Sequence, residues 1–518
     1  MKRLPIGIQN FEKIRTENYI YVDKTRHVLN LIQNGGYYFL SRPRRFGKSL
    51  LVDTLKCLFE GKKHLFNELY IYQHWDWNQT HPVLHFNLSI FDNSDKSLFI
   101  NSLSRYIKRI FDKYEISQYF IPDASIKENT YNLIYHIHEK TQKKVVVLID
   151  EYDKPILDNI EKPEYSKEIR DILRGFYEVF KAADEHLQFV FLTGVSKFSK
   201  VSIFSGLNNL NDITIDSQFS SILGYTQDEV ETYFGKMLDG VDMNKLKWWY
   251  NGFNWNGESV YNPFDILLFI DKGKQFQSYW FQTGTPTFLM KILMEKKFFI
   301  PEIENITAGE ALLSSFDIEN IDPLTLLFQT GYLTIKSSLQ KGERIEYILN
   351  YPNLEVKMAF NDVLLKYYTN KHNETEIYLN KLYDLLYDAK IENIIQLFHS
   401  LFSGIPYQWY INNRLNEYEG FFASVFYSVF QSLGITVIPE DTTNKGRIDL
   451  TVIINNNIFI FEFKTSDESD NNIYPLQQIK NKKYHEKYLH QNKNIYLIGI
   501  EFSKKDRNIA KYEYEKIN

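Results

Sequence analysis

The chain has 518 residues, more than one compact core usually holds at ~100–200 residues per domain, so several domains are expected. Hydrophobic residues make up 44% and charged residues 24%, which excludes a largely disordered or fibrous protein. The net charge of -5 excludes whole-chain attraction to nucleic acid, so any such contact must be local. A single cysteine, Cys57, excludes an intramolecular disulfide and suits a reducing compartment, so we expect the cytoplasm.

The first 200 residues alternate apolar strand-like runs with amphipathic helical stretches, the pattern of a parallel α/β sheet. The predicted strands are 37–40, 83–88, 145–149 and 189–192. The predicted helices are 47–59, 97–115, 125–141 and 165–185. We therefore predict a three-layer α/β domain over residues 1–215. No signal peptide or membrane span is expected, because polar residues interrupt the apolar runs.

The segment SRPRRFGKS, residues 41–49, lies between a predicted strand and a predicted helix, as a phosphate-binding loop requires. Backbone amides and the helix N-terminus can face an anion there. Lys48 would reach the β- and γ-phosphates of ATP, and Ser49 would hold Mg²⁺. Arg42 stands where the usual motif has its first glycine. The predicted nucleotide-binding residues of the loop are Arg44, Arg45, Phe46, Gly47, Lys48 and Ser49.

The apolar strand 145–149 ends in two carboxylates, Asp150 and Glu151. The carboxyl end of a buried parallel strand faces the ligand crevice. Asp150 would bind the magnesium shell, and Glu151 would polarise the attacking water as a catalytic residue. Thr193 or Ser196, after the next strand, could sense the γ-phosphate, or residues 193–194 could simply form a turn.

One helix between these strands carries Arg170 and Arg174 one turn apart. They could supply a charge-stabilising arginine, although a surface ion pair is favoured.

In residues 216–384 the alternation of strands and helices gives way to a mostly helical pattern. Thr226 to Glu229 form a capping box that opens a helix through Phe234, and 245–400 are mostly helical. A hairpin is predicted from 331–335 and 345–349. We interpret 216–384 as a helical lid and linker, in which the hairpin permits a winged-helix element, with a plain helical spacer as the alternative.

The C-terminal region 385–518 has the order αβββαβ. Its predicted helices are 414–433 and 475–489, and its predicted strands are 435–439, 447–454, 458–464 and 495–502. If Asn455 and Asn456 form a two-residue turn, residue 454 faces residue 457, and the residue numbers of every directly opposed pair in this hairpin add up to 911. Asp449 then lies opposite Glu462, and Lys464 shares the face of Glu462.

Paired carboxylates suit a divalent ion that activates water for phosphodiester hydrolysis. We predict Asp449 and Glu462 as catalytic metal ligands, with Glu419 as a third ligand and Glu417 as its rival. Lys464 could stabilise developing charge, and Gln478 could position water or phosphate. Tyr484 could line the groove. Lys480, Lys482, Lys483 and Lys487 form either a phosphate track or a solvated helix face.

Two resemblances follow from these motifs. The segments SRPRRFGKS, VVVLIDEYD, LTGVSKFS, GYTQDEV, WYNGF and YNPF resemble the bacterial predicted AAA-ATPase-like family over about residues 4–290. That resemblance implies an additional-strand P-loop ATPase whose phosphate loop is arginine-rich. The C-terminal pattern resembles the PD-(D/E)XK nuclease superfamily, with Ile448 in place of the proline. That domain is often fused to the ATPase-like family.

These features predict an ATPase coupled to a metal-dependent nuclease, using ATP and Mg²⁺, with Mn²⁺ as an alternative at the nuclease site. The expected partner is nucleic acid, with DNA favoured over RNA, and not a membrane. A homo-oligomer is compatible with the resemblance. The alternative is a nucleotide-switched protein whose nuclease-like domain binds nucleic acid or a partner without cleaving it.

Overall fold

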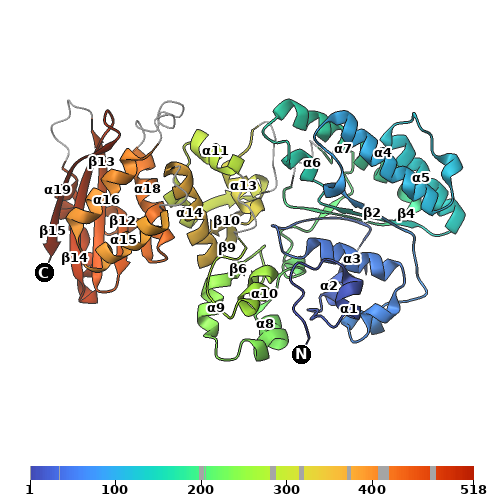
Figure 1. Cartoon of the computed structure of the whole chain (residues 1–518), viewed down its shortest axis with the longest axis horizontal. Coiled ribbons are helices and arrows are strands. Elements are labelled where there is room, and N and C mark those ends of the chain that lie inside the picture. Colours follow the sequence, from blue (N-terminus) through green and yellow to red (C-terminus); the bar gives the residue numbers. More distant parts are fainter. Residues whose placement is uncertain are drawn as a thin grey trace. The chain divides into compact units, whose positions relative to one another are not determined.

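The computed structural model describes residues 2–33, 35–197, 203–204, 206–280, 287–313, 320–369, 375–405, 419–466 and 474–517. The chain forms two compact units (Figure 1). Unit 1 comprises residues 1–280 and 307–348, and unit 2 comprises 281–306 and 349–518. The chain therefore passes between the units three times, and residues 216–384 are divided between them.

Unit 1 is built on a five-stranded parallel sheet in the order β2-β3-β4-β1-β5. The strands are β1 (Tyr37–Ser41), β2 (Val83–Asn87), β3 (Val145–Asp150), β4 (Leu187–Gly194) and β5 (Asn211–Asp212). The four predicted strands are confirmed, because short apolar β-branched and aromatic runs suit a sheet covered on both faces. The two-residue β5 was not predicted.

Helices cover both faces of this sheet (Figure 1). They are α1 (Phe11–Thr16), α2 (Thr25–Gln33), α3 (Lys48–Phe59), α4 (Lys96–Lys113), α5 (Ile126–Thr141), α6 (Lys154–Leu157) and α7 (Pro163–Ala182). Helices α4, α5 and α7 lie on one side and α3 on the other, which confirms the three-layer prediction. Side chains set where α4 and α5 begin, since Asp95 and Ser125 accept hydrogen bonds from the first-turn amides.

Short 3₁₀ helices connect these elements. They are η1 (Lys63–Phe66), η2 (Tyr70–Gln73), η3 (Leu88–Ile90), η4 (Ser117–Tyr119), η5 (Asp184–His186), η6 (Ser217–Phe219) and η7 (Gly235–Met237).

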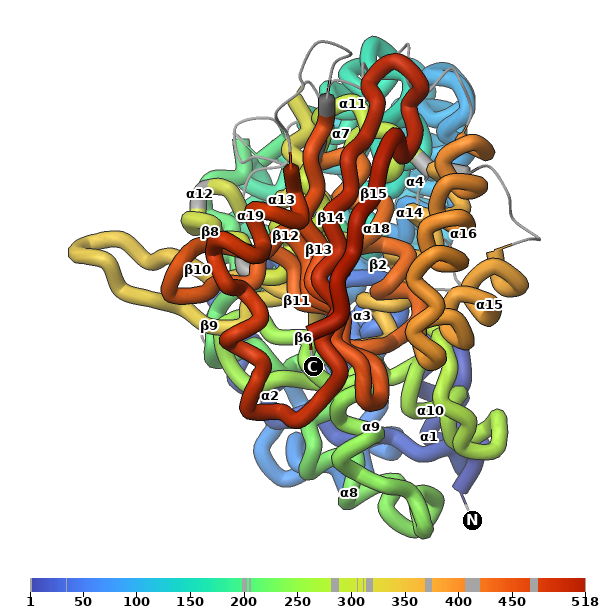
Figure 2. Tube along the Cα trace, turned by 90° about the vertical axis from the view of Figure 1, so that its left-hand side faces the viewer, coloured from blue at the N-terminus to red at the C-terminus, as the bar shows by residue number. Residues whose placement is uncertain are grey.

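The rest of unit 1 is mainly helical. Its helices are α8 (Gln227–Phe234), α9 (Met243–Tyr250), α10 (Pro263–Asp271), α12 (Glu310–Leu313) and α13 (Pro323–Thr330). The predicted capping box at Thr226 and Glu229 is present. A two-stranded sheet joins β6 (Asn251–Phe253) and β7 (Val260–Tyr261). The predicted hairpin forms from β9 (Thr334–Lys341) and β10 (Arg344–Asn350), which extend together in Figure 2. Strand β10 also pairs with β8 (Ile306–Gly309).

Unit 2 contains a mixed sheet in the order β11-β12-β13-β14-β15, in which only β13 and β14 are parallel. The strands are β11 (Thr436–Thr443), β12 (Gly446–Ile454), β13 (Asn457–Ser466), β14 (Asn494–Ser503) and β15 (Asn508–Ile517). The edge strand β15, which lies beside β14 in Figure 2, was not predicted.

The helices of unit 2 are α11 (Thr287–Glu295), η9 (Ile300–Asn305), α14 (Leu354–Thr369), α15 (Thr375–Tyr387), α16 (Ile391–Ser403), α18 (Glu419–Ser432), α19 (Pro475–Lys482) and η11 (Tyr484–Gln491). The prediction of one continuous helix over 475–489 was wrong, because Lys483 adopts a left-handed conformation that ends α19 before η11 begins. Residues 414–418 of the predicted helix lie outside the described residues.

Helix α18 supplies the core of unit 2. Its Phe426 packs against Phe461 and Phe463 of β13 and Phe502 of β14. The stretch 421–439 is thus a buried helix followed by a strand. In the described part of the chain, no helix combines the length and apolar character that crossing a membrane requires.

Candidate active sites

The loop between β1 and α3 has the backbone of an anion-binding turn. Arg45 and Gly47 have φ of 69° and 95°, and Gly47 caps α3. The first hydrogen bond of α3 runs from the Leu51 N–H to the Gly47 carbonyl at 3.0 Å. The amides of Lys48 and Ser49 precede it and therefore lack intrahelical acceptors. Amides so placed at a helix N-terminus can bind phosphate oxygens.

The ammonium of Lys48 lies inside this loop. Its Nζ donates to the carbonyls of Arg42 and Pro43, at 2.9 Å each. Burial lowers the pKa of Lys48, while the carboxylates of Glu151 and Asp150 oppose that shift. The loop therefore encloses the Lys48 ammonium, whose charge interacts with the carboxylates at the end of β3.

Arg42 has a structural position rather than a solvent-facing one. Its fully buried guanidinium donates to the carbonyls of Ser41, Thr214 and Phe219 at 2.9, 2.7 and 3.2 Å. Its Cζ also lies 4.1 Å from the Trp255 ring centroid, a cation–π contact. Burial lowers the pKa of Arg42 to about 9. In place of a flexible glycine, this arginine ties the loop to the segment after β5.

The other predicted loop residues divide into two groups. Arg44 and Arg45 are exposed, and Arg45 lies over the ring of Phe264. Phe46 is buried, in edge contact with Phe253 and Trp255. Its side chain therefore anchors the loop, and only its backbone could face an anion.

The predicted carboxylates lie beside this loop. The Asp150 side chain is 1% exposed and lies close enough to the Ser49 hydroxyl for that group to lower the carboxyl pKa. Burial raises the pKa of Asp150, and the Ser49 hydrogen bond and the Lys48 charge counteract this. Glu151 is half-buried with a φ of 55°. A hydroxyl and a carboxylate near one lysine are the groups that a nucleotide-bound Mg²⁺ requires.

The structure gives Thr193 a contact within the sheet. Its buried hydroxyl donates to the Leu40 carbonyl at 2.8 Å. Ser196, the alternative, donates instead to Asp153 at 2.7 Å. Asp153 was missed by the sequence analysis, although it is fully buried behind Glu151. Burial raises its pKa to about 6, and the charge of Glu151 adds to the effect.

Arg170 and Arg174 both lie 3.4 Å from the carboxylate of Asp171. The surface ion pair favoured from the sequence is therefore what the structure contains.

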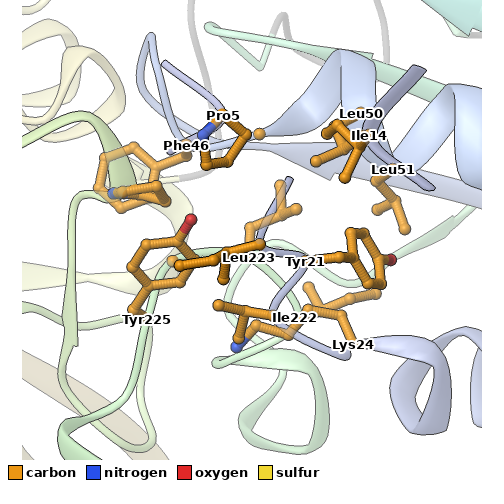
Figure 3. A pocket seen from close by; sticks show the side chains of 15 residues that line it. Pro5, Ile14, Tyr21, Lys24, Phe46, Leu50, Leu51, Ile222, Leu223 and Tyr225 are labelled. Carbon is orange, nitrogen blue, oxygen red and sulfur yellow. The ribbon is translucent and has the colours of Figure 1, made fainter. Parts of the chain in front are cut away.

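An apolar pocket adjoins the phosphate loop (Figure 3). It encloses about 540 Å³ of space, part of it open to solvent. Lys24 brings a cation to it, held by Glu229 at 2.6 Å. The lining residues are Pro5, Ile14, Ile20, Tyr21, Val22, Lys24, Phe46, Gly47, Leu50, Leu51, Ile222, Leu223, Gly224, Tyr225 and Pro263. Parts of the GYTQDEV and YNPF motifs thus lie beside the phosphate loop, a placement that spacing alone could not reveal.

The second site lies on the hairpin of β12 and β13. Five observed pairs, from Leu450 with Phe461 to Ile454 with Asn457, all sum to 911, which confirms the predicted register. Asn455 has the positive φ of 48° that the turn requires. The Asp449 carboxylate accepts a hydrogen bond from the Phe463 N–H at 2.7 Å, so it lies against β13 as predicted.

Three predicted side chains gather around Glu462, which is 1% exposed. Gln478 of α19 donates to Glu462 Oε1, and Lys464 Nζ lies 3.7 Å from the same oxygen. Tyr484 donates to the Arg447 carbonyl at 3.0 Å. Burial raises the pKa of Tyr484, and the carboxylates of Glu462 and Asp449 add to this. The hairpin, α19 and η11 therefore converge on one polar site.

A third ligand is not defined by the structure. Glu419 begins α18, but its side chain and all of Glu417 lie outside the described residues. Among the side chains that are described, no group of three His, Cys, Asp or Glu residues could hold a metal ion. Two carboxylates therefore form the described donor set.

The lysines near Gln478 are largely paired. Lys480 lies 2.6 Å from Glu515, Lys483 lies 3.7 Å from Glu486, and Lys487 pairs with Asp441. This pairing favours the solvated helix face over an open phosphate track.

These two sites define a P-loop ATPase-like unit joined to a nuclease-like unit. A family model for a predicted AAA-ATPase matches residues 5–204, and a PD-(D/E)XK nuclease superfamily model matches residues 417–512. The chain belongs to the family that combines these two domains. A relative from Azotobacter chroococcum mcd 1, described as an uncharacterized protein in the vnfD 5' region, is 45% identical over 521 residues. The match covers 100% of this chain and 99% of the relative.

Proposed function

We propose that the protein binds and hydrolyses ATP through its domain at 1–215 and cleaves nucleic-acid phosphodiesters through its domain at 385–518, with residues 216–384 as lid and linker. The observation that carries the proposal is that the phosphate loop, with the buried ammonium of Lys48, and Asp150 lie at the same end of one parallel sheet, because they stand at the carboxyl ends of β1 and β3. It brings the two halves of a nucleotide site together from segments a hundred residues apart.

In the nucleotide site, the amides at the start of α3 and the Lys48 ammonium would bind the phosphates. Ser49 and Asp150 would hold Mg²⁺, which supplies charge neutralisation at the phosphates. Glu151, at the rim of the same site, would orient the attacking water and accept its proton. Arg44 and Arg45 remain exposed where they can meet phosphate oxygens.

The apolar pocket fits the base and ribose of the nucleotide. Its lining includes Gly47 and Leu50, so a ligand whose phosphates meet the start of α3 would place its base there. Tyr21 and Tyr225 offer aromatic surface for a planar ring.

In the nuclease site, Asp449 and Glu462 would hold Mg²⁺ or Mn²⁺, which would lower the pKa of a bound water. Lys464 would stabilise negative charge on the phosphate, and Gln478 would keep the Glu462 carboxylate oriented. Glu419 remains our proposed third ligand. We propose DNA ahead of RNA as substrate, a cytoplasmic location and a capacity to form homo-oligomers.

Lys48→Ala and Glu151→Gln test the nucleotide site. Lys48→Ala should lose ATP binding, because the phosphates lose their cation. Glu151→Gln should bind ATP but release phosphate at least about 100-fold more slowly. Lys56→Ala, at a half-buried position of the same helix, is the matched control and should behave as wild type. Wild-type hydrolysis by both site variants would refute the assignment.

Asp449→Asn and Glu462→Gln test the nuclease site with little change of shape. Each should abolish cleavage of DNA in Mg²⁺ or Mn²⁺ and leave ATP binding intact. Glu486→Ala, an exposed acid of η11, serves as the control. Nucleic-acid binding without cleavage by the wild type, across DNA and RNA, would instead support a nucleotide-switched binding protein.

A further inference from the structure

The turn after β3 is tied to the loop after β4 by one buried carboxylate. Asp153 Oδ2 accepts hydrogen bonds from the Val195 N–H at 3.0 Å and from the Ser196 N–H at 2.6 Å. The Ser196 hydroxyl donates to the same oxygen at 2.7 Å. Three donors on one oxygen fix the position of the second loop relative to the first.

Tyr152 adds two bonds to the same connection. Its N–H donates to the Thr193 carbonyl at 3.1 Å, and its hydroxyl donates to the Ser196 carbonyl at 2.9 Å. Gly194 leaves no room between them, because a Cβ there would lie 2.4 Å from Asp153 Oδ1 and 2.5 Å from Tyr152 Cδ1. The two loops are therefore in close contact along their length.

Glu151 lies within this tied turn in a strained conformation. Its φ of 55° lies in the left-handed region, which is unfavourable for a non-glycine residue, and such strain persists only where the surroundings enforce it. Its N–H donates to Asp150 Oδ1 at 3.0 Å, and its carbonyl accepts from the Lys154 N–H at 3.0 Å. On the C-terminal side of Glu151, the hydrogen bonds of Tyr152 and Asp153 hold the backbone in this conformation.

We propose that Asp153 is a positioning residue that holds Glu151 and the loop after β4 in the geometry needed for ATP hydrolysis, without contributing to ATP binding. The inference rests on the proposed function, in which Glu151 orients the attacking water. Asp153 would act through Glu151 rather than through contact with the nucleotide.

Fold stability alone does not account for this carboxylate. Asp153 is fully buried beside the like charge of Glu151, and an ionised group there opposes folding at neutral pH. An asparagine has the same shape but holds these three donors less strongly, because its amide oxygen carries no charge and its NH2 group cannot accept a hydrogen bond. A purely structural role would therefore predict that folded Asp153→Asn keeps the wild-type kcat.

The test compares Asp153→Asn and Asp153→Ala with wild type, measuring phosphate release and the Kd of a non-hydrolysable ATP analogue. Asp153→Asn should lower kcat about 10-fold and Asp153→Ala about 100-fold, as expected for a misplaced catalytic group. The Kd should stay within about threefold, and the melting temperature of Asp153→Asn should equal or exceed that of wild type at pH 7.5. Ser166→Ala removes another buried hydroxyl of unit 1 and is the control.

A wild-type kcat in Asp153→Asn, or a loss of kcat matched by a loss of analogue binding, would overturn the inference. If neither Asp153 variant folds, Ser196→Ala removes one donor and should lower kcat about threefold at constant Kd; an unchanged kcat counts against the proposal. Glu151→Gln distinguishes a failure of the proposed function from a failure of the inference about Asp153. Rapid ATP hydrolysis by Glu151→Gln would refute both. Slow hydrolysis by Glu151→Gln together with a wild-type kcat in Asp153→Asn would refute only the inference.

Discussion

Replacing Arg42 with glycine would restore the usual phosphate-loop motif, yet we expect it to damage the protein. The guanidinium is buried and supplies hydrogen bonds to the carbonyls of Thr214 and Phe219. Its removal would leave both carbonyls without these donors and would end the contact with Trp255. The substitution would also free the loop backbone in the unfolded chain.

The size of the effect follows from these contacts. The Phe219 carbonyl keeps the Ile222 N–H at 3.3 Å, so only the Thr214 carbonyl loses its donor, which costs about 1–3 kcal/mol, and a desolvated cation–π contact contributes about 2 kcal/mol. Against this, burying the guanidinium is itself unfavourable, as the lowered pKa of Arg42 shows. We expect a net loss of about 2–4 kcal/mol, somewhat less than the sum of these two contributions because the burial penalty is relieved at the same time. In thermal unfolding this corresponds to a decrease of roughly 3–6 °C for the transition of unit 1.

Differential scanning fluorimetry on Arg42→Gly, with Arg44→Gly as the matched control, checks this reasoning. Arg44 is the exposed neighbour in the same loop, so its loss should change stability by no more than about 0.5 kcal/mol. Arg42→Lys should recover only part of the stability, since an ammonium cannot reproduce the planar fork. A melting temperature for Arg42→Gly at or above that of wild type would show that the buried arginine does not hold the loop.

Three further outcomes are expected. Burial raises the pKa of Asp153 from 3.8 to about 6, so the folded state retains a proton that the unfolded chain has released, and this contribution to stability is lost as pH rises from about 4 to about 6. The stability of Asp153→Asn relative to wild type should therefore increase by about 3 kcal/mol over that range, measured as the difference in melting temperature. Leu223→Trp should fill the pocket and weaken ATP binding in calorimetry, while the affinity for tripolyphosphate stays the same. If ATP controls cleavage, Lys48→Ala should remove the dependence of the DNA cleavage rate on ATP, and an unchanged dependence would contradict coupling.

The nuclease hairpin was predictable because its geometry is local. A two-residue turn at Asn455 fixes the pairing of both strands, and the period of two then decides which carboxylates share a face. The first four strands of unit 1 were predictable for a related reason, since buried parallel strands are continuous apolar runs. In contrast, β15 alternates lysine, glutamate and exposed tyrosine at the sheet edge, a pattern that lacks a buried face.

Contacts between distant segments could not be predicted from spacing. In the sequence, Asp153 is simply a third acidic residue after the predicted strand 145–149. Its role depends on the close approach of β3 and β4 at Gly194. Phe46 was expected at the nucleotide, whereas its ring packs against Phe253 and Trp255. Both cases depend on which surfaces meet in three dimensions, and the local pattern carries no information on that.

The path of the chain limits how the protein can be divided. The chain leaves unit 1 after Trp280, returns at Thr307 and leaves again after Ile348. A fragment that stops at Trp280 would lack the Thr334 hydroxyl, which bonds the Asn254 carbonyl at 3.0 Å, and Gly331, which packs against Pro43 of the phosphate loop. A single cut therefore cannot separate unit 1 from unit 2 with both units complete. In evolutionary terms, recombination at one junction could not exchange either unit whole, so the two would be inherited together.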